Sequence, residues 1–174
     1  MVQNIAIVGL NRSQAYETAK LLAEELDMHF FDALELFEFD NIPRTFQVLL
    51  EEYGEKYYRK KEKGIIGYSS EFSECVLNFE GGVAELKTNI KEIKKNSLLI
   101  YLDVNKESLK KTLDNIKYNS LEEKKFYNIS LSKIQKRIDN LQACADIVVD
   151  ANIGSQLKIV SKILRAIKEY YTKK

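Results

Sequence analysis

The chain has 174 residues, of which 45% are hydrophobic and 30% are charged, a composition typical of a folded globular protein and not of a disordered or fibrous one. Its 27 basic and 26 acidic residues leave a formal net charge of +1, which argues against a general nucleic-acid binder and against a polybasic membrane-surface protein. Two cysteines and a single histidine are too few for a zinc site or a disulfide framework, and no apolar segment is long enough to span a bilayer, so we expect a cytoplasmic protein.

Short apolar runs predict five β-strands, because the buried strands of a parallel sheet read as nearly continuous hydrophobic segments. In chain order, the predicted strands are residues 4–8, 28–31, 75–79, 97–102 and 147–150. Between them, apolar residues recur three and four positions apart, as on the buried face of a helix. The predicted helices are residues 13–26, residues 45–70, a helix from about residue 106, and residues 155–171.

Strands that alternate with longer helices are typical of βαβ units. The predicted fold is therefore α/β, with three α/β/α layers around a central five-stranded parallel sheet. No linker or internal repeat divides the chain, so residues 1–174 are expected to form one domain, and the polar segment 113–128 is a candidate lid. Ligands of such sheets bind at the carboxyl ends of the strands, so the residues that follow each strand are the candidates for a site.

The first predicted strand ends at a glycine and precedes a helix, which is the setting of the phosphate-binding loop G-x-x-x-x-G-K-[ST]. In that loop the glycines let backbone N–H groups point at phosphates, the lysine neutralises charge and the hydroxyl holds Mg²⁺. The corresponding residues are Gly9, Leu10, Asn11, Arg12, Ser13, Gln14, Ala15 and Tyr16. The second glycine, the lysine and the hydroxyl residue are thus replaced by Gln14, Ala15 and Tyr16. Arg12 can replace the lysine only from a different position, so we prefer to interpret it as an exposed loop charge.

Other segments resemble the shikimate kinase family. The stretch from Gly54 to Glu62 resembles the family signature G-E-x-x-F-R-x-x-E, with Tyr58 in place of phenylalanine. Glu62, at its end, is expected to orient an arginine or its helix. Arg137 lies nine residues before Asp146, similar to the family's R-x-P-L-Y-x-x-x-A-D stretch.

Two shorter segments add to this resemblance. Residues 31–35 (FDALE) resemble the family's acidic F-D-x-D-E segment, and residues 80–83 (EGGV) resemble its G-G-G-[AV] turn. The matching segments extend over residues 4–167 in the family's order. The resemblance implies a P-loop-kinase-like fold.

Shikimate kinases are cytoplasmic enzymes that pass the γ-phosphoryl group of ATP to the 3-hydroxyl of shikimate, with Mg²⁺ and a closing lid. The resemblance implies that Arg59 and Arg137 grip the shikimate carboxylate, and a planar guanidinium fork suits a carboxylate better than lysine does. It also implies that Gly81 and Gly82 belong to the turn whose backbone approaches the substrate. Asp32 is the residue that the resemblance associates with the water shell of the metal, and with catalysis if any occurs.

Four departures from the family pattern weaken these implications. The second acidic residue of the F-D-x-D-E segment, which meets the substrate hydroxyls in the family, is Leu34. The first glycine of the turn is Glu80, a carboxylate directed toward the place of an anionic substrate. The lid arginine is missing from the aligned residues 118–121, and the tyrosine after the second arginine is Leu141.

Each candidate also has a simpler structural interpretation. Arg59 and Arg137 can be solvated charges on helix faces, and Asp32 can be a turn residue at a strand end. Gly81 and Gly82 can form an ordinary turn after a strand.

Three functions follow from the sequence. The leading one is a shikimate-kinase-like protein with a degenerate ATP phosphate loop, catalytically inactive or impaired, that binds shikimate or a related small carboxylate in a regulatory role without a cofactor or metal. The alternative is a divergent active shikimate kinase that uses ATP and Mg²⁺ through Arg12 and Asp32. The third is a non-enzymatic interaction or dimerisation module, because the chain has ten tyrosines and eight phenylalanines. The expected oligomeric state is a monomer or a homodimer.

Overall fold

The computed structural model describes residues 4–40, 46–115, 117, 121, 124–125, 131–152 and 154–173. The predicted lid, residues 113–128, lies largely outside the described residues. Among the described helices, none combines the length and the apolar character that crossing a membrane requires.

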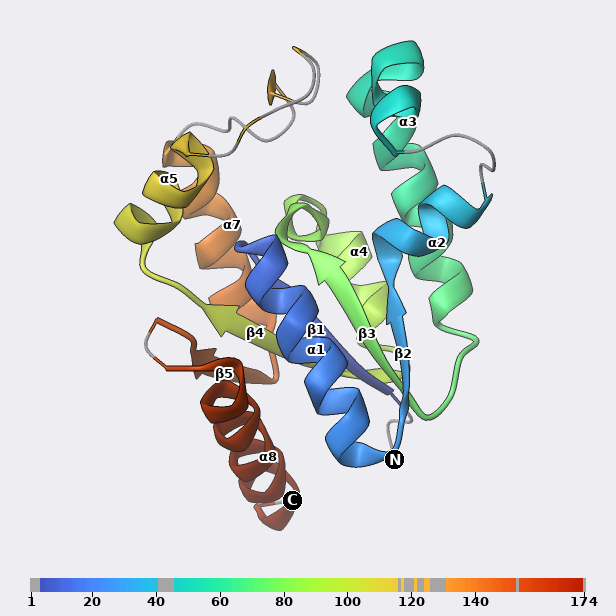
Figure 1. The fold of residues 1–174 in the computed structure, drawn as a ribbon. Coiled ribbons are helices and arrows are strands. Elements are labelled where there is room, and N and C mark those ends of the chain that lie inside the picture. The colour runs from blue at the N-terminus through green and yellow to red at the C-terminus, as the bar shows by residue number, and fades with distance from the viewer. Residues whose placement is uncertain are drawn as a thin grey trace.

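Five parallel strands form one sheet, as predicted. They are β1 (Asn4–Gly9), β2 (His29–Asp32), β3 (Cys75–Glu80), β4 (Ser97–Asp103) and β5 (Ile147–Asp150). Their order across the sheet is β2-β3-β1-β4-β5, and every neighbouring pair is parallel. The central strand β1 therefore has β3 on one side and β4 on the other (Figure 1).

The described helices are α1 (Arg12–Leu26), α2 (Ala33–Asp40), α3 (Phe46–Ser69), the 3₁₀ turn η1 (Gly81–Glu85), α4 (Lys87–Ile93), α5 (Lys106–Asp114), α7 (Leu131–Cys144) and α8 (Gln156–Thr172). The predicted helix 45–70 corresponds to α3, which bends at Gly54, where φ is 75° and ψ is 176°. A residue with a side chain is strained at such a positive φ, so glycine suits this bend. The helices α2, α4 and α7 go beyond those predicted from the sequence.

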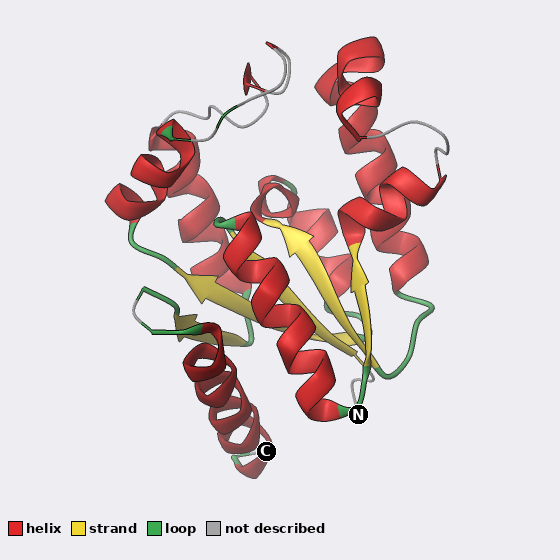
Figure 2. Cartoon of the chain, viewed as in Figure 1, coloured by secondary structure: helices red, strands yellow, loops and turns green. Residues whose placement is uncertain are grey.

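Side chains of β1 alternate between the two faces of the sheet, which explains the three layers. Ile5 and Ile7 pack with residues of α1 and α8, whereas Ala6 and Val8 pack in a second core with residues of α3, α4 and α7. Because both faces are covered, the strand is apolar at every position of this run. Figure 2 shows the helices on both sides of the sheet, and the predicted α/β/α architecture is confirmed.

The carboxyl ends of β1, β2 and β3 lie together, because neighbouring parallel strands run in the same direction. Gly9 at the end of β1 is in register with Glu80 at the end of β3, and Asp32 at the end of β2 is in register with Asn78. The turn η1 directly follows β3, and α1 begins at Arg12, two residues beyond the end of β1. Residues from distant parts of the chain therefore meet at this edge of the sheet.

Candidate functional site

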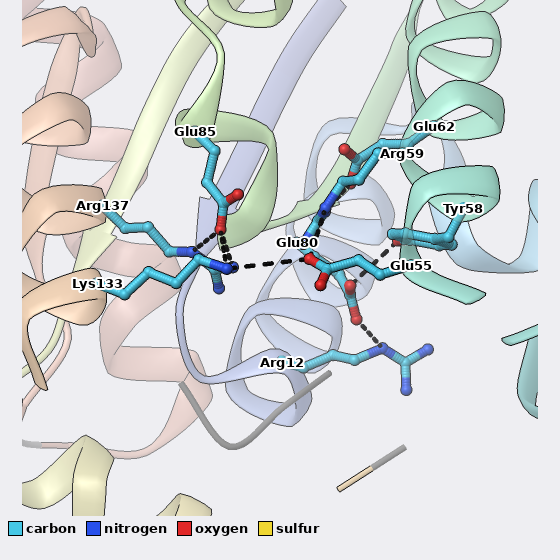
Figure 3. Close-up of polar contacts among 9 residues, drawn as sticks. All are labelled: Arg12, Glu55, Tyr58, Arg59, Glu62, Glu80, Glu85, Lys133 and Arg137. Atoms are coloured by element: carbon cyan, nitrogen blue, oxygen red, sulfur yellow. Dashed lines mark hydrogen bonds and ion pairs between the residues drawn. The ribbon is translucent and has the colours of Figure 1, made fainter. Parts of the chain in front are cut away.

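A cluster of charged side chains lies at this edge, and Figure 3 shows how its members face one another. Four cations meet four carboxylates from α1, α3, β3, η1 and α7. The cluster comprises Arg12, Arg59, Lys133 and Arg137, together with Glu55, Glu62, Glu80, Glu85 and the phenol of Tyr58.

Arg59 lies on α3 and points into the cluster. Its Nη1 atom donates a hydrogen bond of 2.8 Å to Glu62 Oε1, and its Nε atom lies 3.5 Å from Glu55 Oε1. The guanidinium rests against Gly82, where an added Cβ atom would stand only 2.5 Å from Nη1. The side chain is 17% exposed, so its interpretation as a solvated helix-face charge is wrong. The structure thus brings together Arg59 and Gly82, two of the predicted site residues.

Glu62 is the buried partner of Arg59 and is only 5% exposed. Burial raises the pKa of its carboxyl group to about 7, against the opposing effect of the Arg59 charge. Its second oxygen, Oε2, is buried and accepts no hydrogen bond from the described part of the chain. The expectation that Glu62 orients an arginine agrees with this geometry. Near neutral pH the group is only partly ionised, so it does not fully neutralise Arg59.

Arg137 approaches from α7 on the other side of the turn η1. Its Nε atom donates a hydrogen bond of 2.9 Å to Glu85 Oε1, and Nη2 contacts the same oxygen. Lys133, one helical turn earlier, places its Nζ atom 3.5 Å from that oxygen and 4.0 Å from Glu55 Oε1. Arg137 is only 10% exposed, so it too is not a solvated surface charge.

Sequence reasoning did not identify Lys133, Glu55 or Glu85 as members of the site. A signal for Lys133 was present, because residues four positions apart share a helix face and Lys133 precedes Arg137 by four. Glu85 carries no such signal, since it meets Arg137 across 52 positions of the chain.

Asp32 ends β2 and is almost completely buried, at 2% exposure. Its carboxylate accepts hydrogen bonds of 2.6 Å from Asn78 Nδ2 and 3.2 Å from the backbone N–H of Glu35, and Arg12 Nη2 lies 3.7 Å away. Burial raises the pKa of Asp32, although Asn78 and Arg12 oppose the increase.

Arg12 is the first residue of α1 and bridges two carboxylates. Besides approaching Asp32, its Nε atom lies 3.3 Å from Glu80 Oε1. Its side chain is 44% exposed, as the preferred interpretation of an exposed loop charge expects, but Arg12 begins a helix instead of lying in a loop, and it is paired with carboxylates. Glu80 is held on its other side by the phenol of Tyr58, which donates a hydrogen bond of 3.2 Å to Oε2.

The connection between β1 and α1 is much shorter than the phosphate-loop motif would need. Only Leu10 and Asn11 separate Gly9 from the first residue of α1. The Asn11 side chain caps the helix, because its Oδ1 atom accepts hydrogen bonds from the Gln14 backbone N–H at 3.4 Å and from Ser13 Oγ at 3.1 Å. The Asn11 carbonyl accepts a further hydrogen bond of 3.0 Å from the Ala15 N–H. The backbone N–H groups of Gln14 and Ala15 are thus both engaged in hydrogen bonds to Asn11.

Side chains of the same region contact the neighbouring strands. Gln14 Nε2 donates a hydrogen bond of 2.8 Å to the carbonyl of Ala151, directly after β5. The Tyr16 phenol donates a hydrogen bond of 2.9 Å to Glu35 Oε1, and its ring packs edge-on against Phe30 at 5.3 Å between centroids. Tyr16 is therefore held toward β2 and α2.

Three further positions have structural roles. Leu34 and Leu141, at the places of a family acid and a family tyrosine, are buried in apolar cores. Gly81 lies against Leu10, where an added Cβ atom would overlap the leucine side chain. It therefore lets η1 approach the β1–α1 connection.

No group of three or more histidine, cysteine, aspartate or glutamate side chains within the described ranges is arranged to hold a metal ion. Asp32 is surrounded instead by the Asn78 amide and the Arg12 guanidinium.

Comparison with known proteins places this chain in a family. The model of the shikimate kinase family matches residues 17–168. The chain belongs to the shikimate kinase family. A shikimate kinase from Sulfurihydrogenibium sp. is 29% identical over 170 residues, which cover 96% of this chain and 99% of that protein. A second shikimate kinase, from Persephonella marina, is 27% identical over 167 residues, which cover 96% of this chain and all of that protein.

Solved shikimate kinase structures share the fold. The shikimate kinase from Acinetobacter baumannii in complex with shikimate superposes with a TM-score of 0.79 at 21% identity and covers 97% of this chain and 94% of its own. The enzyme from Bacteroides thetaiotaomicron gives a TM-score of 0.76 at 20% identity, with 98% of both chains covered. The predicted P-loop-kinase-like fold is thereby confirmed.

Proposed function

We propose that this member of the shikimate kinase family binds shikimate or a closely related small carboxylate, and that it transfers phosphate from ATP weakly or not at all. Its role in this proposal is regulatory, as a sensor of that carboxylate. The observation that supports the proposal is a contrast within one site. Arginines stand at the positions where the family resemblance implies carboxylate binding, whereas a capped helix end takes the place of the phosphate loop.

The substrate side supports carboxylate binding. Arg59 and Arg137 converge from α3 and α7 on the turn η1, and both guanidinium groups are largely shielded from water. Guanidinium groups in such surroundings form strong paired hydrogen bonds with carboxylates. Gly82 supports the same role, since its lack of a side chain lets Arg59 lie against the turn.

The nucleotide side supports weak or absent phosphate transfer. The motif positions of the phosphate lysine and the magnesium hydroxyl are held by Ala15 and Tyr16. The N–H groups of Gln14 and Ala15 are bonded to Asn11, and the family model begins to match only after Tyr16. Each lost donor to a developing charge costs about 10²–10³ in turnover, so two losses reduce it by roughly 10⁴ or more.

The residues around Asp32 do not fit a magnesium nucleotide. Arg12 already brings a positive charge to Asp32 and to Glu80, where the resemblance expects a metal with its water shell. No catalytic step through ATP or Mg²⁺ is therefore part of the proposal.

The second candidate is an active shikimate kinase, which phosphorylates the 3-hydroxyl of shikimate with ATP and Mg²⁺. The comparisons taken alone favour this candidate, because relatives named as shikimate kinases align over nearly the whole chain. Under it, Arg12 would replace the missing lysine from the first turn of α1.

Two measurements on the same preparation separate the candidates. Isothermal calorimetry with shikimate, and then with quinate, tests binding, and a coupled assay of ADP release with ATP, Mg²⁺ and shikimate tests transfer. We expect heat with shikimate that Arg59→Ala abolishes and Arg165→Ala on α8 leaves unchanged, together with no ADP release above background. Turnover of roughly 1–100 per second, as kinases typically show, would establish the second candidate instead. Absence of heat with either acid would overturn the carboxylate proposal.

A further inference from the structure

Glu85 already places a carboxylate among the cations of the substrate side. It accepts hydrogen bonds from two nitrogens of Arg137, and Lys133 lies 3.5 Å from the same oxygen (Figure 3). Burial would raise the pKa of Glu85, but Arg137, Arg59 and Lys133 together lower it. Two cations of α7 thus contact one carboxylate that belongs to the chain, and the charge of Arg59 on α3 also acts on it.

The glutamate side chains of the site differ in how readily they can rotate away from their cations. Glu62 is 5% exposed and lies in the middle of α3, so its side chain cannot rotate into water while the helix stays in place. Glu85 is 26% exposed and is the last residue of the short turn η1, next to the exposed Leu86. A rotation of the Glu85 side chain toward water would release Arg137 and Lys133 without unfolding a helix.

Resting on the carboxylate binding proposed above, we infer that Glu85 is an internal stand-in for the ligand carboxylate and that Lys133 is a third cation of the ligand site. A small carboxylate binds by displacing Glu85 and takes over its contacts with Arg137 and Lys133, while Arg59 keeps Glu62. The family resemblance assigns neither Glu85 nor Lys133 to the site.

The exchange explains how a site with nearly matched charges still accepts an anion. Glu55, Glu62 and Glu85 face Arg59, Lys133 and Arg137, so with Glu85 in place an added anion would meet only the part of the Arg59 charge that Glu62 leaves uncompensated. When Glu85 leaves, one carboxylate replaces another and the charge balance is kept. The apparent affinity equals the intrinsic affinity multiplied by the fraction of molecules in which Glu85 has left Arg137 and Lys133.

Calorimetric titration of shikimate into the wild type and Glu85→Gln tests the inference. Glutamine keeps the size and an acceptor oxygen but removes the competing charge, so we expect at least about tenfold tighter binding, which corresponds to a coupling of about 1.4 kcal/mol. Shikimate methyl ester, which has no carboxylate, should show no such gain. Glu92→Gln on α4, which removes an ion pair with Lys95 outside the cluster, is the matched control and should bind like the wild type.

Two further variants separate charge from other effects. Glu85→Asp keeps the net charge but shortens the side chain, and we expect affinity between those of the wild type and Glu85→Gln. Lys133→Gln should weaken shikimate binding about tenfold, whereas Lys136→Gln, an exposed lysine on the same helix, should not. Melting temperatures without ligand show whether each variant is folded.

The outcomes distinguish this inference from the binding proposal itself. If the wild type binds shikimate and Glu85→Gln binds no more tightly, the stand-in role is overturned while carboxylate binding survives. Binding by Glu85→Gln alone would support the stand-in role, since it means that Glu85 blocks the wild-type site, but it would overturn shikimate binding by the wild type. If neither protein binds shikimate, both ideas fall. An equal gain for the methyl ester would also contradict the stand-in role.

Discussion

Arg12 and Glu80 form an ion pair of 3.3 Å between the first turn of α1 and the end of β3. The same guanidinium approaches the buried Asp32 at the end of β2, so a single arginine links three elements at the edge of the sheet. A bound metal ion would also supply positive charge to the carboxylates of Asp32 and Glu80. Here the Arg12 side chain provides it.

We expect Arg12→Ala to lower the free energy of unfolding by less than about 1 kcal/mol at neutral pH, because the pairs of a half-exposed arginine are screened by water. The loss should depend on pH. Without Arg12 the raised pKa of Asp32 rises further, and the stability linked to a raised carboxyl pKa is present at low pH and lost as pH rises through the folded-state pKa. The difference in stability between the variant and the wild type should therefore be larger at pH 7.5 than at pH 4.5.

Urea unfolding at both pH values measures this difference. Arg165→Ala, which removes an exposed arginine from α8, should differ from the wild type equally at the two pH values. A pH-independent effect of Arg12→Ala would mean that Arg12 does not act on the Asp32 carboxylate.

Gly9→Ala should destabilise the protein by about 1–3 kcal/mol, because its Cβ atom would lie 2.7 Å from the Cβ of Ala15. Both atoms are bonded directly to the backbone, so β1 and α1 would have to separate. Gly64→Ala, on an exposed position of α3 with no atom within 4 Å of the added Cβ, should instead stabilise the protein by up to about 1 kcal/mol. Urea denaturation gives both values, and equal effects of the two alanines would contradict the close approach of α1 to β1.

The fold could be predicted from the sequence because the three central strands, β1, β3 and β4, are buried on both faces and read as apolar runs. Runs such as that of β4, SLLIYL, leave few other interpretations, and all five predicted strands are present in the parallel sheet. The helix α2 was missed because its sequence, ALELFEFD, places apolar residues partly at alternate positions, which is not a clear helical period.

The site was predicted only in part, for a physical reason. Arg59 and Gly82 could be located because they belong to compact motifs, and the structure brings them into contact. Glu85 could not, since its meeting with Arg137 and Lys133 depends on how α7 packs against η1, and no local pattern encodes that packing. Lys133 could have been found from its spacing of four residues before Arg137. The role of Arg12 was also missed, because it depends on the early start of α1.

Glu62→Gln should change how stability depends on pH. The pKa of Glu62 is raised from an ordinary value near 4.5 to about 7, so its protonated form favours folding below pH 4.5 and this contribution is lost as pH rises to about 7. Over that interval the wild type should lose about 3 kcal/mol from this group, and the variant, which cannot titrate there, should not.

Urea unfolding between pH 4.5 and 8 measures the two profiles. Val48→Ala, a non-titrating change at an exposed position of the same helix, should shift the wild-type profile without changing its shape. Parallel profiles for the wild type and Glu62→Gln would show that the Arg59 charge fully offsets the burial of Glu62.

Rebuilding the phosphate loop tests the nucleotide side directly. The triple variant Gln14→Gly, Ala15→Lys and Tyr16→Thr restores the second glycine, the lysine and the hydroxyl of the motif. Without ligand it should be less stable than the wild type by roughly 1 kcal/mol for each lost hydrogen bond, to Ala151 and to Glu35. With ATP and Mg²⁺ present, its melting temperature should rise, whereas that of the wild type should not.

The size of the expected shift can be stated. A nucleotide at one hundred times its dissociation constant adds about 2.7 kcal/mol to the free energy of unfolding, which is readily measured as a thermal shift. The control carries methionine in place of the restored lysine, so it has the new glycine and threonine but no added charge, and it should respond much less to ATP. An equal thermal shift for the wild type would show that the capped start of α1 still admits a nucleotide, because only binding to the native state can raise its melting temperature.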